Sequence, residues 1–195
     1  MIAQLQGRLV EKHPTELIID CAGVGYEVKI SLNCFSALGD SEQVKVYTKL
    51  IVREDAHLLY GFSSVDEKQM FQHLVSVNGV GPSTAVMVLS SLNPDQLREA
   101  IAGNDIRTLQ AVKGIGAKTA QRLILELKDK VGRESSTDHA SGHGTGNMLR
   151  SEALSALTTL GINRAAAEKS IDVILKRSGN TISLEELVKL ALKTA

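Results

Sequence analysis

The chain has 195 residues, of which 43% are hydrophobic and 3% aromatic, and its 22 Lys and Arg side chains balance 22 Asp and Glu. This composition is typical of globular domains and excludes a disordered or fibrous chain. No apolar run approaches the roughly 18 residues of a membrane span, and the first residues lack the apolar core of a signal peptide, so we expect a cytoplasmic protein without a membrane partner.

Residues 1–62 are expected to form an all-β domain. Short β-prone runs, such as Leu17–Cys21, Tyr26–Ile30 and Val44–Thr48, alternate with turn residues. About six strands in this length favour a small closed barrel, which leaves no exposed sheet edge. Gly23 and Gly25 then belong to a hairpin and not to a phosphate loop, because a strand follows them. The only two cysteines of the chain match no metal-binding or disulfide pattern.

A polar turn lies near the end of this β-rich segment. Arg53-Glu54-Asp55 separates the apolar run 50–52 from the run 58–60, which predicts a hairpin tip. Acidic residues at a tip are ordinary on a solvated surface. Two adjacent carboxylates would, however, repel any phosphate group brought near them.

Residues 63–131 change to a helical periodicity. A capping box over Ser64–Glu67 opens a helix with Phe71, Leu74 and Val75 on its inner face, and Asn93 precedes a proline at the first position of another helix. With 8 basic and 7 acidic residues, this segment is close to neutral. Any contact with nucleic acid must therefore be geometrically focused.

An internal repeat is the most informative feature of this helical segment. A Gly-apolar-Gly turn occurs twice between predicted helices, and every element of the second copy lies 35 residues after the first. Glycine permits positive φ and a close approach of the backbone to a ligand. The helix that follows each turn presents unpaired backbone N–H groups and the positive end of its dipole, which is a site for a phosphate group. The pattern resembles the helix-hairpin-helix motif, and two copies suggest a module that grips both strands of a duplex.

The candidate phosphate-binding residues come from both turns. The first copy offers hydroxyl groups and the second offers basic side chains next to the turn, since Lys118 and Arg122 are separated by one helical turn. A solvated basic face with no ligand is the alternative interpretation. The expected DNA-phosphate contacts are Gly79, Val80, Gly81, Ser83, Thr84, Gly114, Ile115, Gly116, Lys118, Thr119 and Arg122.

Residues 132–147 contain one alanine and no larger apolar side chain, which predicts a flexible linker. His139 and His143 within it are too few to hold zinc, so no metal site is expected. Residues 148–195 predict a three-helix bundle with helices near 149–160, 164–177 and 184–194. The core of this bundle is expected to include Leu154, Leu157, Ile171, Ile174, Leu184, Leu187 and Ala191, whereas Val173, Leu175 and Leu190 are candidates for a partner-binding groove.

The order of these segments, together with Ala22-Gly23-Val24-Gly25-Tyr26, Arg53-Glu54-Asp55-Ala56, Leu59–Phe62 and Gly79-Val80-Gly81-Pro82, closely resembles the bacterial RuvA family. These proteins are the Holliday junction-binding subunits of the RuvAB branch-migration complex. The resemblance covers the whole chain. It implies an OB-type barrel (1–62), a tandem helix-hairpin-helix domain (63–131), a linker (132–147) and a terminal bundle (148–195). Ser83 departs from the lysine that many members have in the first hairpin.

The resemblance also implies an assembly. A homotetramer would lie flat on the open four-way junction with Glu54 and Asp55 as an acidic pin at its centre, and the terminal bundle would recruit the hexameric RuvB ATPase. Whether one tetramer or two (an octamer) bind stays open, and the RuvC resolvase is a further candidate partner. The chain itself would have no catalytic residue and no cofactor, because ATP is used by RuvB. Its roles would be recombination, DNA repair and the SOS response.

Three alternatives stay open. Lys118 and Asp138 have the spacing of the catalytic pair in helix-hairpin-helix DNA glycosylases, although the predicted linker could not hold Asp138 in place. A single-strand binder would need exposed aromatic platforms such as Tyr26, Tyr47 and Tyr60. A protein adaptor built on the terminal bundle leaves the repeat unexplained. Lys118 also follows a glycine-alanine pair that does not match a P-loop, so ATP hydrolysis is not expected.

Overall fold

The computed structural model describes residues 1–138, 145–178 and 182–194. The chain divides into two compact units, Met1–Ser136 and Thr137–Ala195. None of the helices in the described part of the chain combines the length and apolarity needed to cross a bilayer.

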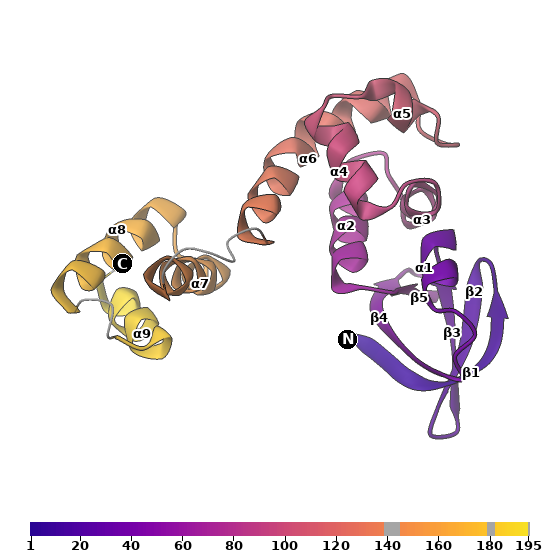
Figure 1. Ribbon diagram of the computed structural model, residues 1–195, viewed down its shortest axis with the longest axis horizontal. Coiled ribbons are helices and arrows are strands. Elements are labelled where there is room, and N and C mark those ends of the chain that lie inside the picture. The colour runs from indigo at the N-terminus through magenta and orange to yellow at the C-terminus, as the bar shows by residue number, and fades with distance from the viewer. Residues whose placement is uncertain (139–144, 179–181, 195) are drawn as a thin grey trace. The chain divides into compact units, whose positions relative to one another are not determined.

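The first unit begins with a closed five-stranded barrel (Figure 1). Around it the strands follow the order β1-β2-β3-β5-β4, and the contact between β3 and β5 is the parallel one. Side chains that alternate along the strands fill its interior, which includes Leu17, Ile19 and Val28, each with no exposed surface. The strands are β1 (Gln4–His13), β2 (Glu16–Cys21), β3 (Val24–Ile30), β4 (Gln43–Val52) and β5 (His57–Phe62).

The barrel has five strands where about six were expected from the sequence, because the runs 44–48 and 50–52 belong to one strand, β4. A short helix, α1 (Leu32–Ala37), lies between β3 and β4. The hydroxyl of Ser31 accepts a hydrogen bond from the amide of Cys34 at 3.0 Å and so caps this helix. Burial, and then the nearby charge of Glu67, raise the pKa of the Cys34 thiol. Serine is a typical N-cap residue, so this helix start has a local cause in the sequence.

The hairpin predicted at Gly23 is confirmed, since this residue lies in the turn between β2 and β3 with φ of +90°. Gly25 is instead a strand residue, paired with Asp20.

Five helices complete the first unit: α2 (Val65–Ser76), α3 (Pro82–Ser91), α4 (Pro94–Ala102), α5 (Ile106–Gln110) and α6 (Ala117–Asp138). The end of the barrel packs into their core, where the ring of Phe71 lies 5.1 Å from that of Tyr60 and 4.9 Å from that of Phe62, measured between centroids. Phe71 and Leu74 are fully buried, as the periodicity predicted. The end of β5 therefore belongs to the apolar core of the helices, while the barrel interior forms an apolar cluster of its own.

The predicted linker is partly helical. Helix α6 continues to Asp138 and helix α7 begins at Thr145, so residues 132–138 and 145–147 are in regular structure. Extending an existing helix adds one hydrogen bond for each residue that is ordered, and 133–138 contain no glycine or proline to interrupt it. His139 and His143 lie outside the described residues.

The second unit is the predicted three-helix bundle, formed by α7 (Thr145–Thr159), α8 (Arg164–Ser178) and α9 (Leu184–Thr194). The guanidinium of Arg150 joins α7 to α8 through two hydrogen bonds to Asp172, at 2.8 and 3.2 Å. All the predicted core residues pack in its interior, with Leu154 and Leu184 only partly buried.

Candidate nucleic-acid interface

The two repeated turns have the same backbone. Gly79 and Gly114 both have φ of +92°, which is the left-handed region that favours glycine. The hydrogen bonds around each turn also correspond. They are Val80 N to Val77 O and Ile115 N to Val112 O, both 3.1 Å, and Ala85 N to Gly81 O and Ala120 N to Gly116 O, both 2.9 Å. The repeat in the sequence is therefore a repeat in three dimensions.

The apolar members of the repeat hold each turn to its helices. Val80 and Ile115, between the glycines, are 4% and 6% exposed. Ala85 and Ala120 are completely buried, so the helices on either side pack closely at both places. These burials confirm the structural part that the sequence predicts for each of these residues.

The second glycine of each turn has no structural reason to lack a side chain. Gly81 has an ordinary φ of −82°, and a Cβ atom built on Gly81 or on Gly116 meets nothing within 4 Å. Both residues are exposed, directly before α3 and α6. No side chain caps the start of α3. The first amides of these helices thus face a space that the backbone of a ligand can approach closely.

The side chains beside the turns differ between the copies. In the first copy, Ser83 is exposed and Thr84 half-buried, and neither carries charge. In the second copy, Lys118 is exposed and Thr119 is half-buried. No acidic side chain among the described residues forms an ion pair with Lys118. Its ammonium group is thus available to an anion beside the second turn.

Arg122, a predicted phosphate ligand, also has partners within the protein. Its guanidinium Nη1 donates to the carbonyl oxygen of Asn78 at 3.1 Å, and its Nε lies 3.8 Å from a carboxylate oxygen of Glu126. The side chain keeps 50% of its surface exposed. Arg122 thus joins the helix of the second hairpin to the turn of the first.

Met87 of the first copy makes the corresponding contact with the turn of the second copy. It occupies the position equivalent to Arg122, 35 residues earlier in the chain. A Cβ atom on Gly114 would lie 3.4 Å from its Cε and 3.9 Å from Cγ2 of Thr84. Each hairpin therefore contacts the turn of the other, which holds the two candidate phosphate sites at a defined spacing. Sequence reasoning missed this role for Asn78 and Met87, because neither is charged or part of the repeat pattern.

Glu54 and Asp55 form the predicted tip. Val52 pairs with His57, and the amide of Arg53 donates to the carbonyl of Ala56 at 2.8 Å, so the two acids occupy the end of the β4–β5 hairpin. Both are exposed. No basic side chain of the described residues forms an ion pair with either. The tip is a local concentration of negative charge.

The groove residues predicted on the terminal bundle have different environments. Val173 and Leu190 are 48% and 36% exposed. Leu175, by contrast, is half-buried against the bundle core, so the interpretation that it is surplus to the core is wrong. Its position on α8 places it one residue after the buried Ile174, on the margin of the apolar face. Two apolar residues that were not predicted, Leu160 and Leu192, are 61% and 42% exposed.

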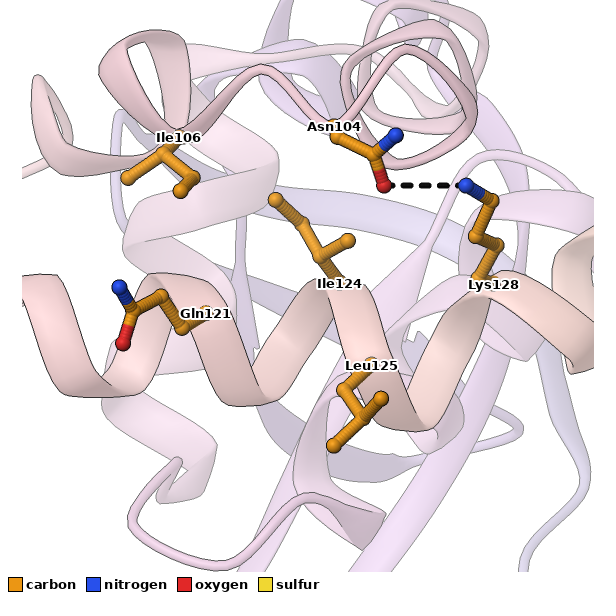
Figure 2. Close-up of a pocket in the computed structure, with 6 residues that line it drawn as sticks. All are labelled: Asn104, Ile106, Gln121, Ile124, Leu125 and Lys128. Atoms are coloured by element: carbon orange, nitrogen blue, oxygen red, sulfur yellow. Dashed lines mark hydrogen bonds between the residues drawn. The ribbon is translucent and has the colours of Figure 1, made fainter.

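A shallow hollow between α6 and the segment 104–106 has a volume of about 430 Å³ (Figure 2). Ile124 projects from the helix toward Ile106 and Asn104, and the amine of Lys128 donates to the side-chain oxygen of Asn104 at 3.0 Å. Leu125 also lines the hollow, but it points away from Asn104 and Ile106 and is 80% exposed. The sequence contained no signal for this hollow, because its lining comes from two separate segments.

The geometry argues against two alternatives. Lys118 lies at the start of α6 in the first unit, whereas Asp138 is the last residue of that helix and belongs to the second unit, so one compact unit does not hold both as a glycosylase centre. Tyr60 is 2% exposed, and Tyr26 and Tyr47 are partly buried against apolar clusters, so none of the three tyrosines is a fully exposed stacking platform. The helix α5, not a strand, precedes the second turn, which is unlike a P-loop. In the described part, no three His, Cys, Asp or Glu residues gather into a potential metal site.

Comparison with known proteins adds three family matches. Residues 1–61 match the model described as "RuvA N terminal domain", residues 71–129 match "SAM-like Helix-hairpin-helix tandem", and residues 149–195 match "RuvA, C-terminal domain".

Curated relatives extend over nearly the whole chain. A protein of Cytophaga hutchinsonii is 51% identical over 200 residues, which cover 99% of both chains. One from Christiangramia forsetii is 51% identical over 99% of both chains, and one from Amoebophilus asiaticus is 48% identical over 99% of this chain and 100% of its own. All three are named "Holliday junction branch migration complex subunit RuvA".

Proposed function

This chain belongs to the RuvA family, and on that premise we propose that it binds four-way (Holliday) junction DNA as a homotetramer. The tetramer holds the junction open and planar and recruits the RuvB ATPase for branch migration during recombination and repair. The observation that carries the proposal is the pair of turns with matching geometry. Each presents backbone amides of a helix N-terminus to a phosphate group without reading a base.

The two turns act together on one duplex arm. The reciprocal contacts of Arg122 with Asn78 and of Met87 with Gly114 support a fixed spacing between the two bound phosphates. Lys118 adds a positive charge at the second site, and Ser83 and Thr84 add hydroxyl donors at the first. Binding through phosphates makes the recognition independent of sequence, as a junction that moves along DNA requires.

The acidic tip repels phosphate groups, whereas the two turns bind them. Exposed carboxylates of Glu54 and Asp55 repel phosphates, so a tip at the centre of a tetramer excludes the DNA backbone from the crossover and keeps the strands apart. Attraction along the arms and repulsion at the centre together favour an open junction over a continuous duplex.

The terminal bundle supplies the partner contact. Val173 and Leu190, exposed on α8 and α9, are the proposed contacts with RuvB. RuvB hydrolyses the ATP, so this chain needs no cofactor and no catalytic residue of its own. RuvC is a further proposed partner, and either one tetramer or two (an octamer) enclose the junction in the bacterial cytoplasm.

A gel-shift titration tests the proposal. The full chain is titrated against a four-way junction and a linear duplex of identical sequence, at moderate salt with competitor DNA. We expect a strong preference for the junction and a complex of tetramer size. Equal affinity for the two DNAs contradicts junction recognition and leaves a general duplex-binding protein.

The tip has its own test in the double substitution Glu54→Gln and Asp55→Asn. Removing the repulsive charges keeps or tightens junction binding but changes the rate of branch migration with RuvB. The measurement is strand exchange of a labelled junction over a range of salt concentrations. A migration rate equal to that of the unmodified chain at every salt concentration rejects the repulsive role.

A further inference from the structure

The short helix α1 is where the barrel meets the helical domain. It lies between β3 and β4 in the chain and beside α3 at the end of the barrel (Figure 1). Two sets of hydrogen bonds hold it, one from α2 and one from α3. We call these residues the α1 clamp: Ser31, Leu32, Asn33, Ser63, Glu67, Leu89 and Ser90.

Glu67 is the centre of the clamp. This residue of the first turn of α2 is only 2% exposed. One carboxylate oxygen accepts a hydrogen bond from the hydroxyl of Ser31 at 2.5 Å. The other accepts from the amide and from the hydroxyl of Ser63, both at 2.9 Å. A single buried carboxylate thus joins α2, the start of α1 and the residue that follows β5.

This arrangement differs from the capping box that the sequence predicts. The amide of Glu67 does donate to the hydroxyl of Ser64 at 3.0 Å, which is half of the predicted box. The carboxylate, however, reaches past the N-cap to Ser63 and across to Ser31. Glu67 therefore does more than complete its own helix end.

The second set of bonds comes from the end of α3. The side-chain amide of Asn33 donates to the carbonyl of Leu89 at 2.5 Å, and the amide of Leu32 donates to the hydroxyl of Ser90 at 3.0 Å. Both helices of the first hairpin consequently hold α1, so the barrel cannot turn relative to this hairpin without breaking buried or half-buried hydrogen bonds.

The clamp lies at one end of the strand whose other end carries the acidic tip. Strand β5 begins at His57, directly after the tip, and ends at Phe62, next to Ser63. Six extended residues span about 20 Å. The position of Glu54 and Asp55 relative to the first turn is therefore set by β5 and by what holds its end.

We propose that Glu67 is a positioning residue for junction recognition, which fixes the acidic tip relative to the phosphate-binding turns. This inference rests on the proposed function. A linear duplex needs only the turns, whereas a junction needs the turns and the tip in one rigid arrangement. Loosening the clamp therefore lowers the affinity for a junction and leaves the affinity for a duplex unchanged.

The main test is Glu67→Gln in the full chain, which keeps the size of the side chain but makes one oxygen a donor. A donor in place of an acceptor leaves at least one buried hydroxyl or amide unpaired. We expect the ratio of junction affinity to duplex affinity to fall about tenfold, because the free energy lost with one such hydrogen bond corresponds to a change in affinity of about this size. The same gel-shift titration on both DNAs measures this ratio.

A matched control separates positioning from general stability. Ile19→Val removes one methyl group from the fully buried barrel core, outside the clamp. It should lower the midpoint of thermal unfolding without changing the affinity ratio. Ser31→Ala and Asn33→Ala each remove one clamp hydrogen bond. They should lower the ratio less than Glu67→Gln does, and they keep the test valid where that variant does not fold.

A second readout reports the clamp directly. Cys34 is fully buried beneath it, so its rate of modification by a thiol reagent, followed by peptide mass spectrometry, measures how often α1 opens. We expect Glu67→Gln to raise this rate and Ile19→Val to leave it unchanged.

The outcomes distinguish this inference from the proposed function. An unmodified chain that binds junction and duplex equally rejects the proposed function itself. An unmodified chain that prefers the junction, with clamp variants that keep the preference or weaken both affinities equally, rejects only the positioning role of Glu67.

Discussion

The two hairpins have the same backbone but different surfaces. Their turn glycines share φ of +92° and their turn hydrogen bonds agree to within 0.2 Å. Yet the first copy has serine where the second has lysine, at Ser83 and Lys118. The repeat therefore preserves what the backbone geometry requires, namely two glycines, a buried apolar residue and a buried alanine. The charge beside each phosphate site is free to differ.

The helices that lead into the two turns also differ. In the first copy α2 has 12 residues and is tied to the barrel through Glu67. In the second copy α5 has 5 residues and is capped by Asp105, whose carboxylate accepts from the amide of Thr108 at 3.1 Å and from its hydroxyl at 2.6 Å. The first hairpin is thus anchored by tertiary contacts and the second by a local cap.

The largest effect on DNA affinity is expected from a carboxylate placed in either turn, by Gly81→Asp or by Gly116→Asp. Both positions have open space, so the variants should fold. The new charge lies where a phosphate binds, and repulsion at about 4 Å lowers duplex affinity on the order of 100-fold. If the two turns are equivalent phosphate sites, both losses are similar. Gln96→Glu adds the same charge at the start of α4 and preserves its capping box, so it should bind nearly as the unmodified chain does.

A second comparison concerns stability. Gly79→Ala and Gly114→Ala both place a side chain in left-handed backbone, which costs about 1–2 kcal/mol of unfolding free energy. Gly114→Ala should cost slightly less than Gly79→Ala, because its Cβ makes ordinary van der Waals contact with Cε of Met87 at 3.4 Å, whereas the Cβ at Gly79 meets nothing within 4 Å. Urea unfolding of the two variants measures the difference. A larger loss for Gly114→Ala contradicts the favourable packing of Met87 against this turn.

Two substitutions remove the charge difference between the hairpins, one by adding a lysine to the first and one by removing the lysine of the second. Ser83→Lys gives the first hairpin the lysine of the second, and Lys118→Gln takes it away from the second. Each phosphate that a lysine neutralises contributes about 0.9 to the slope of log affinity against log salt. We expect the slope to steepen by about this amount for Ser83→Lys and to flatten equally for Lys118→Gln. Duplex titrations at several salt concentrations measure it, and an unchanged slope for Lys118→Gln means that this lysine contacts no phosphate.

The smallest effect is an acid sensitivity confined to the second hairpin. The hydrogen bonds from Thr108, first from its hydroxyl and then from its amide, lower the pKa of Asp105. Because the folded-state pKa lies below the unfolded value of about 3.9, the cap is present above that pH and is lost as pH falls through the lowered pKa. Amide exchange at Thr108 should therefore accelerate in this acid range, while exchange in α3 does not. Asp105→Ala should show fast exchange at Thr108 at every pH, and acid-independent exchange in the unmodified chain contradicts the cap.

Features that depend on nearby residues followed from the sequence. The glycine pattern and its 35-residue spacing identified both turns, because positive φ and a buried apolar residue are requirements of a few adjacent positions. The acidic tip and the core of the terminal bundle were also recognisable, since a hairpin and an amphipathic helix each leave a periodic signal. The membership of the RuvA family follows from those same residues.

Tertiary structure alone decided the remaining features, because they join residues that are distant in the chain. Ser31 and Glu67 are 36 positions apart, and Asn78 and Arg122 are 44 apart. Neither pairing leaves a periodic or local pattern, so the sequence did not indicate that the capping glutamate also holds α1 or that Arg122, a predicted phosphate ligand, also contacts the turn of the first hairpin. The placement of the short helix α1 has the same origin, because its hydrogen bonds to Glu67, Leu89 and Ser90 join segments that are distant in the chain.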